Sequence, residues 1–315
     1  MAQTGLGPGI GEIKYVAPAT SATSQYRTQL ESMGVSSGDI FTSPATAFAA
    51  MEANRNDVML VAPGAYDIDT ELAWSKDYTH LIGLGGPNQG GDFSLPGVAI
   101  YTDNVATVET IDCTGDYCQF HNANISNYGN NLACLSAFNL DGYGCAFKSV
   151  SFQGTMTAGN DDVVAAASLY IDQLGHFPLF EDCIIGQNAW DVREGANSGV
   201  LRFVGTTAPA PQNGVFRRCS FLSASETATV AMVALPANTC LDRVWIFDKC
   251  HFDNFSVNAA VTLNQVFYDV CGTTHTIQLN GCTATGFTEW ETSAGRVFQS
   301  MPVASVTGGI ALQSA

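Results

Sequence analysis

Few acidic residues in this chain lie close enough in sequence to suggest a pair of catalytic carboxylates. Asp161 and Asp162 are adjacent in GNDDVV, and Asp191, Arg193 and Glu194 lie close together in WDVREG. Paired carboxylates act as acid and base in polysaccharide cleavage, but adjacent residues of a strand point to opposite faces. We therefore favour a solvated loop for the first pair and a surface salt-bridge cluster for the second group. If the chain is an enzyme, the candidate catalytic residues are Asp161, Asp162, Asp191 and Arg193.

Histidine and cysteine show no catalytic or metal-binding pattern. The five histidines are His80, His121, His176, His251 and His275. None pairs with Ser and Asp at a spacing typical of a triad, so structural roles are expected. Among the ten cysteines, Cys113 and Cys118 lie five apart, but no second pair at metal-like spacing follows. We predict reduced, buried cysteines, with no metal and no cofactor.

A short phrase recurs from the middle of the chain to near its end. Each copy holds an aromatic residue or Leu, two mostly polar residues, a small residue, any residue and an apolar residue. The copies span residues 120–125, 147–152, 180–185, 216–221, 247–252 and, more weakly, 279–284, with starts 27, 33, 36, 31 and 32 residues apart. Such a period indicates a solenoid in which each copy is one corner of a coil.

Stacking the copies in register predicts two columns of core side chains at the strand spacing of about 4.8 Å. One column holds Phe180, Phe216 and Phe247. The other holds Cys183, Cys219, Cys250 and Cys282.

The same register predicts ion pairs between successive coils. It places Glu181 and Asp182 over Arg217 and Arg218, and these over Asp248 and Lys249. Opposite charges on neighbouring strands favour this register by about 0.2–1 kcal/mol a pair.

The segments DVMLVAPGAY (57–66) and HLIGLGG (80–86) resemble the first coils of the pectate-lyase-like β-helix superfamily. The resemblance covers roughly residues 57–287. It implies an all-β fold, a right-handed parallel β-helix of about seven coils. The catalytic motifs of polygalacturonases and pectate lyases are missing, apart from Asp161-Asp162 and a Gly175-His176 that no Gly follows.

The ends of the chain differ from the repeats. Residues 21–33 and 43–54 are predicted to be helices, the second with Ser43 as N-cap and Pro44 in the first turn. Residues 21–56 then form a helical cap on the first coil. Residues 1–20 are predicted to be an extended arm that becomes ordered against a partner, and residues 288–315 to close the other end.

Charge excludes one class of partner. Twelve Lys and Arg face 29 Asp and Glu, a net charge of −17 that repels nucleic acid. The chain start lacks the pattern of a secretory signal, and no apolar stretch reaches the roughly 18 residues of a membrane span. We expect a soluble protein made in the cytoplasm of a host cell.

The chain also resembles the β-helix virion proteins of bacteriophages, which are tailspikes and capsid decoration (cement) proteins, usually trimeric. This resemblance implies a homotrimer on the outside of the capsid that stabilises the shell of a tailed bacteriophage. Its partner would be the major capsid protein. The residues expected to bind the capsid are Gly5, Leu6, Ile10, Ile13 and Tyr15.

Two alternatives remain open. One is a tailspike depolymerase or lyase that acts on a host surface polysaccharide. A cluster of carboxylates within about 10 Å would favour it and scattered carboxylates would refute it. The other is a glycan-binding adhesin that uses exposed aromatics such as Tyr128, Tyr143 and Trp190.

Overall fold

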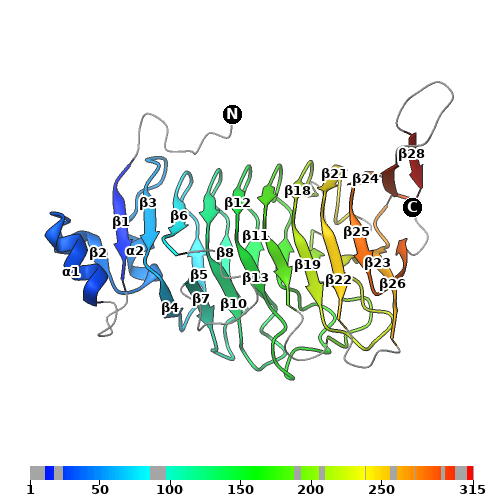
Figure 1. Cartoon of the computed structure of the whole chain (residues 1–315), viewed down its shortest axis with the longest axis horizontal. Helices are drawn as coiled ribbons and strands as arrows, with labels where there is room; N and C mark the ends of the chain where they lie inside the picture. The colour runs from blue at the N-terminus through cyan, green and yellow to red at the C-terminus, as the bar shows by residue number, and fades with distance from the viewer. Residues whose placement is uncertain are drawn as a thin grey trace.

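Three β-sheets run along one axis and enclose a single core (Figure 1). The computed structural model describes residues 11–17, 24–85, 97–187, 193–205, 210–237, 239–255, 261–272, 274–291, 295–301 and 311–314. In these ranges the chain visits sheets A, B and C in turn, and each strand pairs with the equivalent strands of the neighbouring coils. The predicted all-β parallel β-helix is therefore confirmed.

The described strands are as follows, in spatial order. Sheet A holds β2 (Ile40–Phe41), β1 (Ile13–Val16), β3 (Val58–Val61), β6 (His80–Gly83), β9 (Gln119–His121), β12 (Ala146–Lys148), β15 (Leu179–Glu181), β18 (Val215–Arg217), β21 (Arg243–Asp248), β24 (His275–Asn280), β27 (Val297–Met301) and β28 (Ala311–Ser314). Sheet B holds β25 (Thr283–Thr285), β22 (His251–Asn254), β19 (Ser220–Ser223), β16 (Ile184–Gly186), β13 (Ser151–Gln153), β10 (Asn124–Asn127), β7 (Val98–Thr102) and β4 (Gly64–Asp67). Sheet C holds β26 (Phe287–Glu291), β23 (Leu263–Asp269), β20 (Val233–Leu235), β17 (Leu201–Phe203), β14 (Leu169–Ile171), β11 (Ser136–Leu140), β8 (Glu109–Cys113) and β5 (Leu72–Trp74).

A stack of phenylalanine rings fills the core beneath sheet A. The rings of Phe120, Phe147, Phe180, Phe216 and Phe247 lie 5.2, 4.5, 4.5 and 4.9 Å apart, and adjacent rings are within 13° of parallel. Their strands pair directly, Phe180 with Phe216 and Phe216 with Phe247. Register and ring stacking thus reinforce each other along the axis.

A column of cysteines lies beside the rings. Cys183, Cys219, Cys250 and Cys282 are buried and form no disulfide. Each of the last three places its Sγ 3.1–3.5 Å from the carbonyl of a ring residue on the preceding coil, where the thiol donates. These residues therefore pack as small side chains with a weak hydrogen bond.

The polar step of each repeat is the turn from sheet A to sheet B. Asp182, Arg218 and Lys249 adopt a left-handed backbone with φ between 52° and 55°. Such a backbone costs a non-glycine residue about 1–3 kcal/mol. The N–H of each of these residues donates to a carbonyl of the next coil at 2.7–3.0 Å, which offsets that cost.

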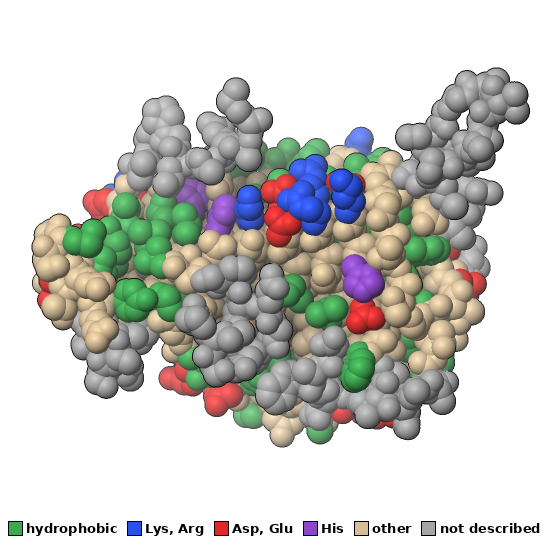
Figure 2. Space-filling view, in the orientation of Figure 1, with side chains coloured by type: hydrophobic (Ala, Val, Ile, Leu, Met, Phe, Trp, Pro, Cys, Tyr) green, Lys and Arg blue, Asp and Glu red, His purple; other side chains and the backbone are tan. Residues whose placement is uncertain are grey.

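Side chains at this turn form the predicted ion pairs. Arg218 pairs with Asp182 at 2.7 Å, and Arg217 bridges Glu181 at 3.1 Å and Asp248 at 3.5 Å. Figure 2 shows these charges as adjoining blue and red groups in a row along the solenoid. Because the groups are partly exposed, water and salt weaken each pair.

Helices lie at the N-terminal end. They are α1 (Ser24–Ser32), the short 3₁₀ helix η1 (Ser37–Asp39) and α2 (Pro44–Ala50). As predicted, Ser43 is the N-cap of α2, accepting from Thr46 N at 3.3 Å, and Pro44 lies in the first turn. The helix ends at Ala50, short of the predicted residue 54. It buries Phe48 against Trp74, with ring centroids 4.4 Å apart, and so covers the first coil.

The extended arm predicted for residues 1–20 needs correction, because residues 13–16 form β1. This strand pairs with β3 and β2, so it extends sheet A beyond the first coil. Buried Lys14 is neutralised by Glu12 and Asp39, both at 2.8 Å. The inward-facing residues of this strand are Lys14 and Val16. A lysine at an inward position conceals the alternation of apolar and polar residues that would have predicted a strand.

The solenoid also continues past residue 287, where the closing segment was expected to begin. Strand β26 pairs with β23 and β27 pairs with β24, both in parallel. Only β28 runs antiparallel to its neighbour among the described strands. No helix in the described ranges is long and apolar enough to cross a membrane.

We predict that Phe216→Ala lowers the free energy of unfolding by about 3–5 kcal/mol, because it leaves a cavity between two stacked rings. Phe255→Ala is the control, since Phe255 is 54% exposed, and it should change stability by less than about 0.5 kcal/mol. Urea denaturation measures both. Equal losses for the two variants would contradict the central role of the ring stack.

Candidate functional site

Asp161 and Asp162 lie in the loop between β13 and β14. The Asp161 carbonyl accepts from the N–H groups of Glu194 and Gly195 at 2.9 and 3.2 Å, which ties this loop to the next coil. Asp162 is exposed, and Asp191 falls outside the described residues. The structure therefore shows the loop that was predicted for Asp161 and Asp162.

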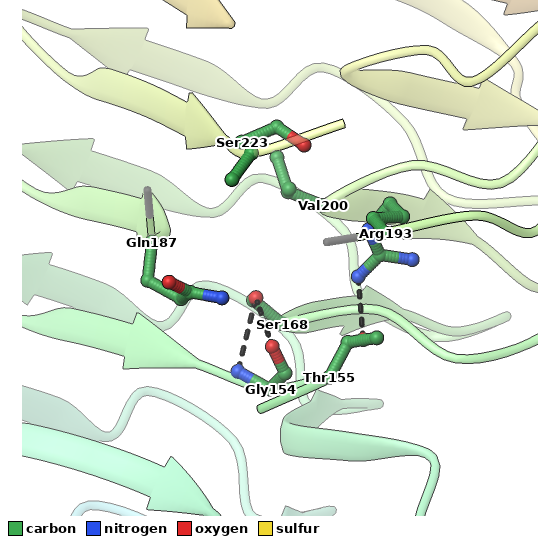
Figure 3. Close-up of a pocket in the computed structure, with 8 residues that line it drawn as sticks. Gly154, Thr155, Ser168, Gln187, Arg193, Val200 and Ser223 are labelled. Carbon is green, nitrogen blue, oxygen red and sulfur yellow. Dashed lines mark hydrogen bonds between the residues drawn. The ribbon is translucent and has the colours of Figure 1, made fainter. Parts of the chain in front are cut away.

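Arg193 was expected in a surface salt-bridge cluster, or in catalysis if the chain is an enzyme, and the structure corrects the surface position because its side chain is buried inside the fold. It lines a small cavity of about 10 Å³ with Thr155, Ser168 and Ser223 (Figure 3). Its guanidinium donates to the carbonyl of Ala166 at 2.7 Å and to the hydroxyl of Thr155. Burial lowers the pKa of Arg193 to about 10. The cavity holds one water molecule at most, so Arg193 cannot reach a polymeric substrate.

The outer face of sheet C carries a row of polar side chains that the sequence analysis did not single out. Strand register places Asp112, Asn139, Tyr170 and Arg202 on consecutive strands, about 4.8 Å apart. Asn139 Nδ2 donates to Asp112 Oδ1 at 2.9 Å, and Arg202 donates to the carbonyl of Val164 at 2.9 Å. The row is therefore held in place by its own hydrogen bonds.

Glu109, at the start of β8, is an acid with a strongly raised pKa. Burial, then the hydrogen bond and charge of Glu71, then the charges of Asp112 and Asp172, raise the pKa of Glu109 to about 8. Two carboxyl groups in hydrogen-bond contact hold one proton between them at neutral pH. Glu109 is thus a carboxylic acid that can donate a proton near pH 7.

Asp112 is the complementary group. Its pKa is raised, first by burial and also by the charge of Asp172, while the hydrogen bond from Asn139 favours the ionised form. The site therefore holds an acid, Glu109, and an oriented carboxylate, Asp112, on the same strand. Residues 71, 109, 112 and 172 thus form a group of interacting carboxyl groups, none of which the sequence pattern had indicated.

Three thiols meet below the turn from sheet C to sheet A. Cys113, Cys118 and Cys145 are buried, and their sulfur atoms all lie within 4.8 Å of one another, a spacing that can hold a metal ion. Their hydrogen-bond partners include Gly115 O at 3.4 Å from Cys145, Lys76 O at 3.4 Å from Cys118, and the Thr79 hydroxyl at 3.8 Å from Cys118. Hydrogen bonds with Cys113 and Cys145 lower the pKa of Cys118, so Cys118 is the thiol of this group that ionises first.

A second buried cluster joins Asp269, Cys271 and His275 near the end of the solenoid. His275 Nε2 lies 2.8 Å from Asp269 Oδ2, and His275 Nδ1 lies 2.9 Å from the carbonyl of Gly272. Burial lowers the pKa of His275, but its bonds to Asp269 and Cys271 outweigh burial and raise the pKa to about 9. With both nitrogens donating, His275 is an imidazolium and not a general base. The three residues lie within seven positions of sequence. This proximity is a signal from which the cluster could have been predicted.

Comparison with known proteins gives the fold. No family model matches the chain, and no curated protein matches it. A mutant pectin methylesterase in complex with a hexasaccharide is 16% identical, with a TM-score of 0.54, covering 89% of this chain and 83% of that one. Pectin methylesterase PemA from Erwinia chrysanthemi is 14% identical, with a TM-score of 0.54, covering 98% and 86%. The chain has a right-handed parallel β-helix fold like these enzymes.

One viral protein is also similar. The Geobacillus virus E2 protein ORF18 is 11% identical with a TM-score of 0.38, covering 81% of this chain and 57% of that one. At that level the likeness carries no argument about function, so the virion assignment stays a prediction.

We predict that the Asp269–His275 ion pair makes stability depend on pH. The pKa of His275 in the folded chain, about 9, lies above the ordinary value of about 6.5. Its contribution is therefore complete below about pH 6.5 and is lost as pH rises through 9. Urea midpoints measured from pH 6 to 10 should fall in the native chain and fall less in His275→Gln. His251→Gln is the control, since the His251 ring bonds a neutral group, the Thr283 hydroxyl at 2.8 Å, and it should keep the native slope.

Proposed function

We propose that this protein is a polysaccharide depolymerase whose active site is the outer face of sheet C. The observation that carries the proposal is the raised pKa of Glu109, about 8, which burial and its hydrogen-bonded neighbour Glu71 produce. A carboxyl group that stays protonated at neutral pH is the general acid that glycoside cleavage needs. The similar fold of carbohydrate-active enzymes supports the substrate class by analogy.

The two carboxyl groups would take the two proton-transfer roles of an inverting hydrolysis. Glu109 and Asp112 lie three residues apart on β8, and the charge of Asp112 acts on Glu109. Inverting enzymes use one carboxyl group as the acid and a second as the base toward a water molecule. Glu109 protonates the glycosidic oxygen while Asp112 takes a proton from water. The water oxygen bonds to the anomeric carbon as the bond to the leaving sugar breaks.

We predict that Glu109→Gln and Asp112→Asn each reduce glycan hydrolysis at least about 100-fold, because each removes one proton-transfer group. Asp162→Asn, in an exposed loop, is the control and should keep native activity. Reducing-end release from a panel of surface polysaccharides is the measurement. Full activity in both site variants, or release of methanol or acetate without chain cleavage, would overturn the assignment.

Glu71 has a separate, positioning role that a pH profile reveals. The acid must be protonated, so native activity should decline as pH rises through about 8. Glu71→Gln removes the charge that helps keep the proton on Glu109, so the alkaline limb should move to lower pH. An unchanged limb would show that Glu71 does not tune Glu109.

Capsid decoration is the second candidate. Apolar side chains at the N-terminal end favour it, namely Met33 at the end of α1, 78% exposed, and Ile13 on β1, 36% exposed. In this proposal a homotrimer on the capsid exterior binds the major capsid protein through that end, including Ile13 and Tyr15. Gly5, Leu6 and Ile10 lie outside the described residues.

Cryo-electron microscopy and mass spectrometry of particles from the source test this second role. Stoichiometric, symmetric copies on an icosahedral shell would support decoration, whereas absence from the shell would overturn it. An Ile13→Asp variant that still binds the shell would remove β1 from the interface.

A further inference from the structure

An open groove lies on the outer face of sheet B, where β4, β7 and β10 run side by side (Figure 1). Its lining residues are Ala65, Tyr101, Asp103 and Tyr128, and its volume is about 430 Å³. That volume lies within the range of roughly 300–1,000 Å³ found for small-ligand sites. The cavity at Arg193 is far smaller, about 10 Å³, and holds one water molecule at most.

Two tyrosine rings form its walls. The rings of Tyr101 and Tyr128 lie 6.0 Å apart at 84°, so one is perpendicular to the other. Both are half-buried, and Tyr128 N donates to the carbonyl of Thr102 at 2.7 Å, which fixes one wall against the other. Burial raises the pKa of both phenols, so both remain neutral at physiological pH. Rigid aromatic walls with a polar tip suit the apolar faces and hydroxyls of sugar rings.

Carboxylates surround these walls. Asp67 is the register neighbour of Tyr101 on β4, and Asp103 follows Tyr101 by two residues. Burial, then the charges of Asp67 and Asp103, raise the pKa of Tyr101, and burial with the charges of Asp103 and Asp69 raises that of Asp67. In the part of the chain that the structure describes, no Lys or Arg pairs with these three aspartates. The groove therefore offers hydrogen-bond acceptors and repels anions.

Two short loops connect the groove to the strands of sheet C that carry the candidate catalytic carboxyl groups. Asp67 precedes Glu71 by four residues, and Asp103 precedes Glu109 by six. Asn104 Nδ2 donates to the carbonyl of Asp69 at 2.6 Å, which ties the two loops together. Four residues span at most about 14 Å, so one glycan chain can contact both the groove and Glu109.

We propose that the Tyr101–Tyr128 groove binds a neutral or N-acetylated stretch of glycan, of about disaccharide size, and rejects sugars that carry a carboxylate. This proposal rests on the proposed depolymerase function, under which the substrate is a polysaccharide. It adds which chemical class of polysaccharide the groove binds. It distinguishes this chain's ligand from an acidic polysaccharide, because Asp103 lines the groove, Asp67 neighbours Tyr101, and no Lys or Arg of the described residues forms an ion pair with either aspartate.

The test is binding of the full chain to an array of neutral, N-acetylated and uronate oligosaccharides, followed by titration calorimetry with the best neutral oligosaccharide. We expect neutral or N-acetylated glycans to bind and uronates not to bind. Tyr101→Ala and Tyr128→Ala should each weaken binding about tenfold or more. Tyr26→Ala is the matched control, a 37% exposed tyrosine on α1, and it should bind as the native chain does.

A second variant tests the charge argument. Asp103→Asn keeps the shape of an exposed side chain and removes one negative charge, so it should strengthen uronate binding relative to the native chain. Binding of uronates in preference to neutral glycans, no glycan binding, or full binding by both tyrosine variants would overturn the proposal. Each variant is checked for an unchanged unfolding midpoint.

The same experiment separates this inference from the proposed function. Glu109→Gln should bind the neutral glycan with native affinity while failing to cleave it. If the native chain binds but never cleaves, the depolymerase assignment fails and the groove stands. If neither tyrosine variant affects binding while cleavage proceeds, the groove assignment fails and the depolymerase stands.

Discussion

The fixed spacing between parallel strands is the constraint on which the whole molecule depends. Backbone hydrogen bonds hold neighbouring strands about 4.8 Å apart, and a stack of flat rings fits that distance with small adjustments. The ring stack from Phe120 to Phe247, with centroids 4.5–5.2 Å apart, satisfies both demands together. A slip of one residue would move every ring from the core to the surface, so the register is strongly determined.

The same spacing brings polar groups together outside the core. Residues that occupy equivalent positions on successive coils become neighbours, whatever their separation in sequence. Glu71 and Glu109 are 38 residues apart and share a hydrogen bond. Their contact, rather than any local motif, produces a carboxyl group that stays protonated at neutral pH. In this β-helix, the stacking of loops from neighbouring coils thus raises the pKa of Glu109.

Burial has opposite consequences at different charged residues. Arg193 is enclosed by carbonyl and hydroxyl groups, so its charge serves the packing of loops. Asp269 and His275 neutralise each other inside the fold. Glu109 is only half-buried, in contact with solvent, and that partial exposure is what makes its proton available to a substrate. Exposure, and not residue type, separates structural charges from candidate catalytic ones.

The amino-acid sequence by itself determined the solenoid, the ring and cysteine columns, the ion pairs at the turn and the N-cap at Ser43, because each follows from a repeated or local pattern. Three features were beyond it: the strand at residues 13–16, the burial of Arg193 and the meeting of Glu71 with Glu109. These depend on which loops from different coils lie side by side. Loop lengths differ from coil to coil. Outward-facing residues therefore do not recur at the regular sequence interval that the core residues keep. Only the tertiary structure decides which of these outward-facing residues are in contact.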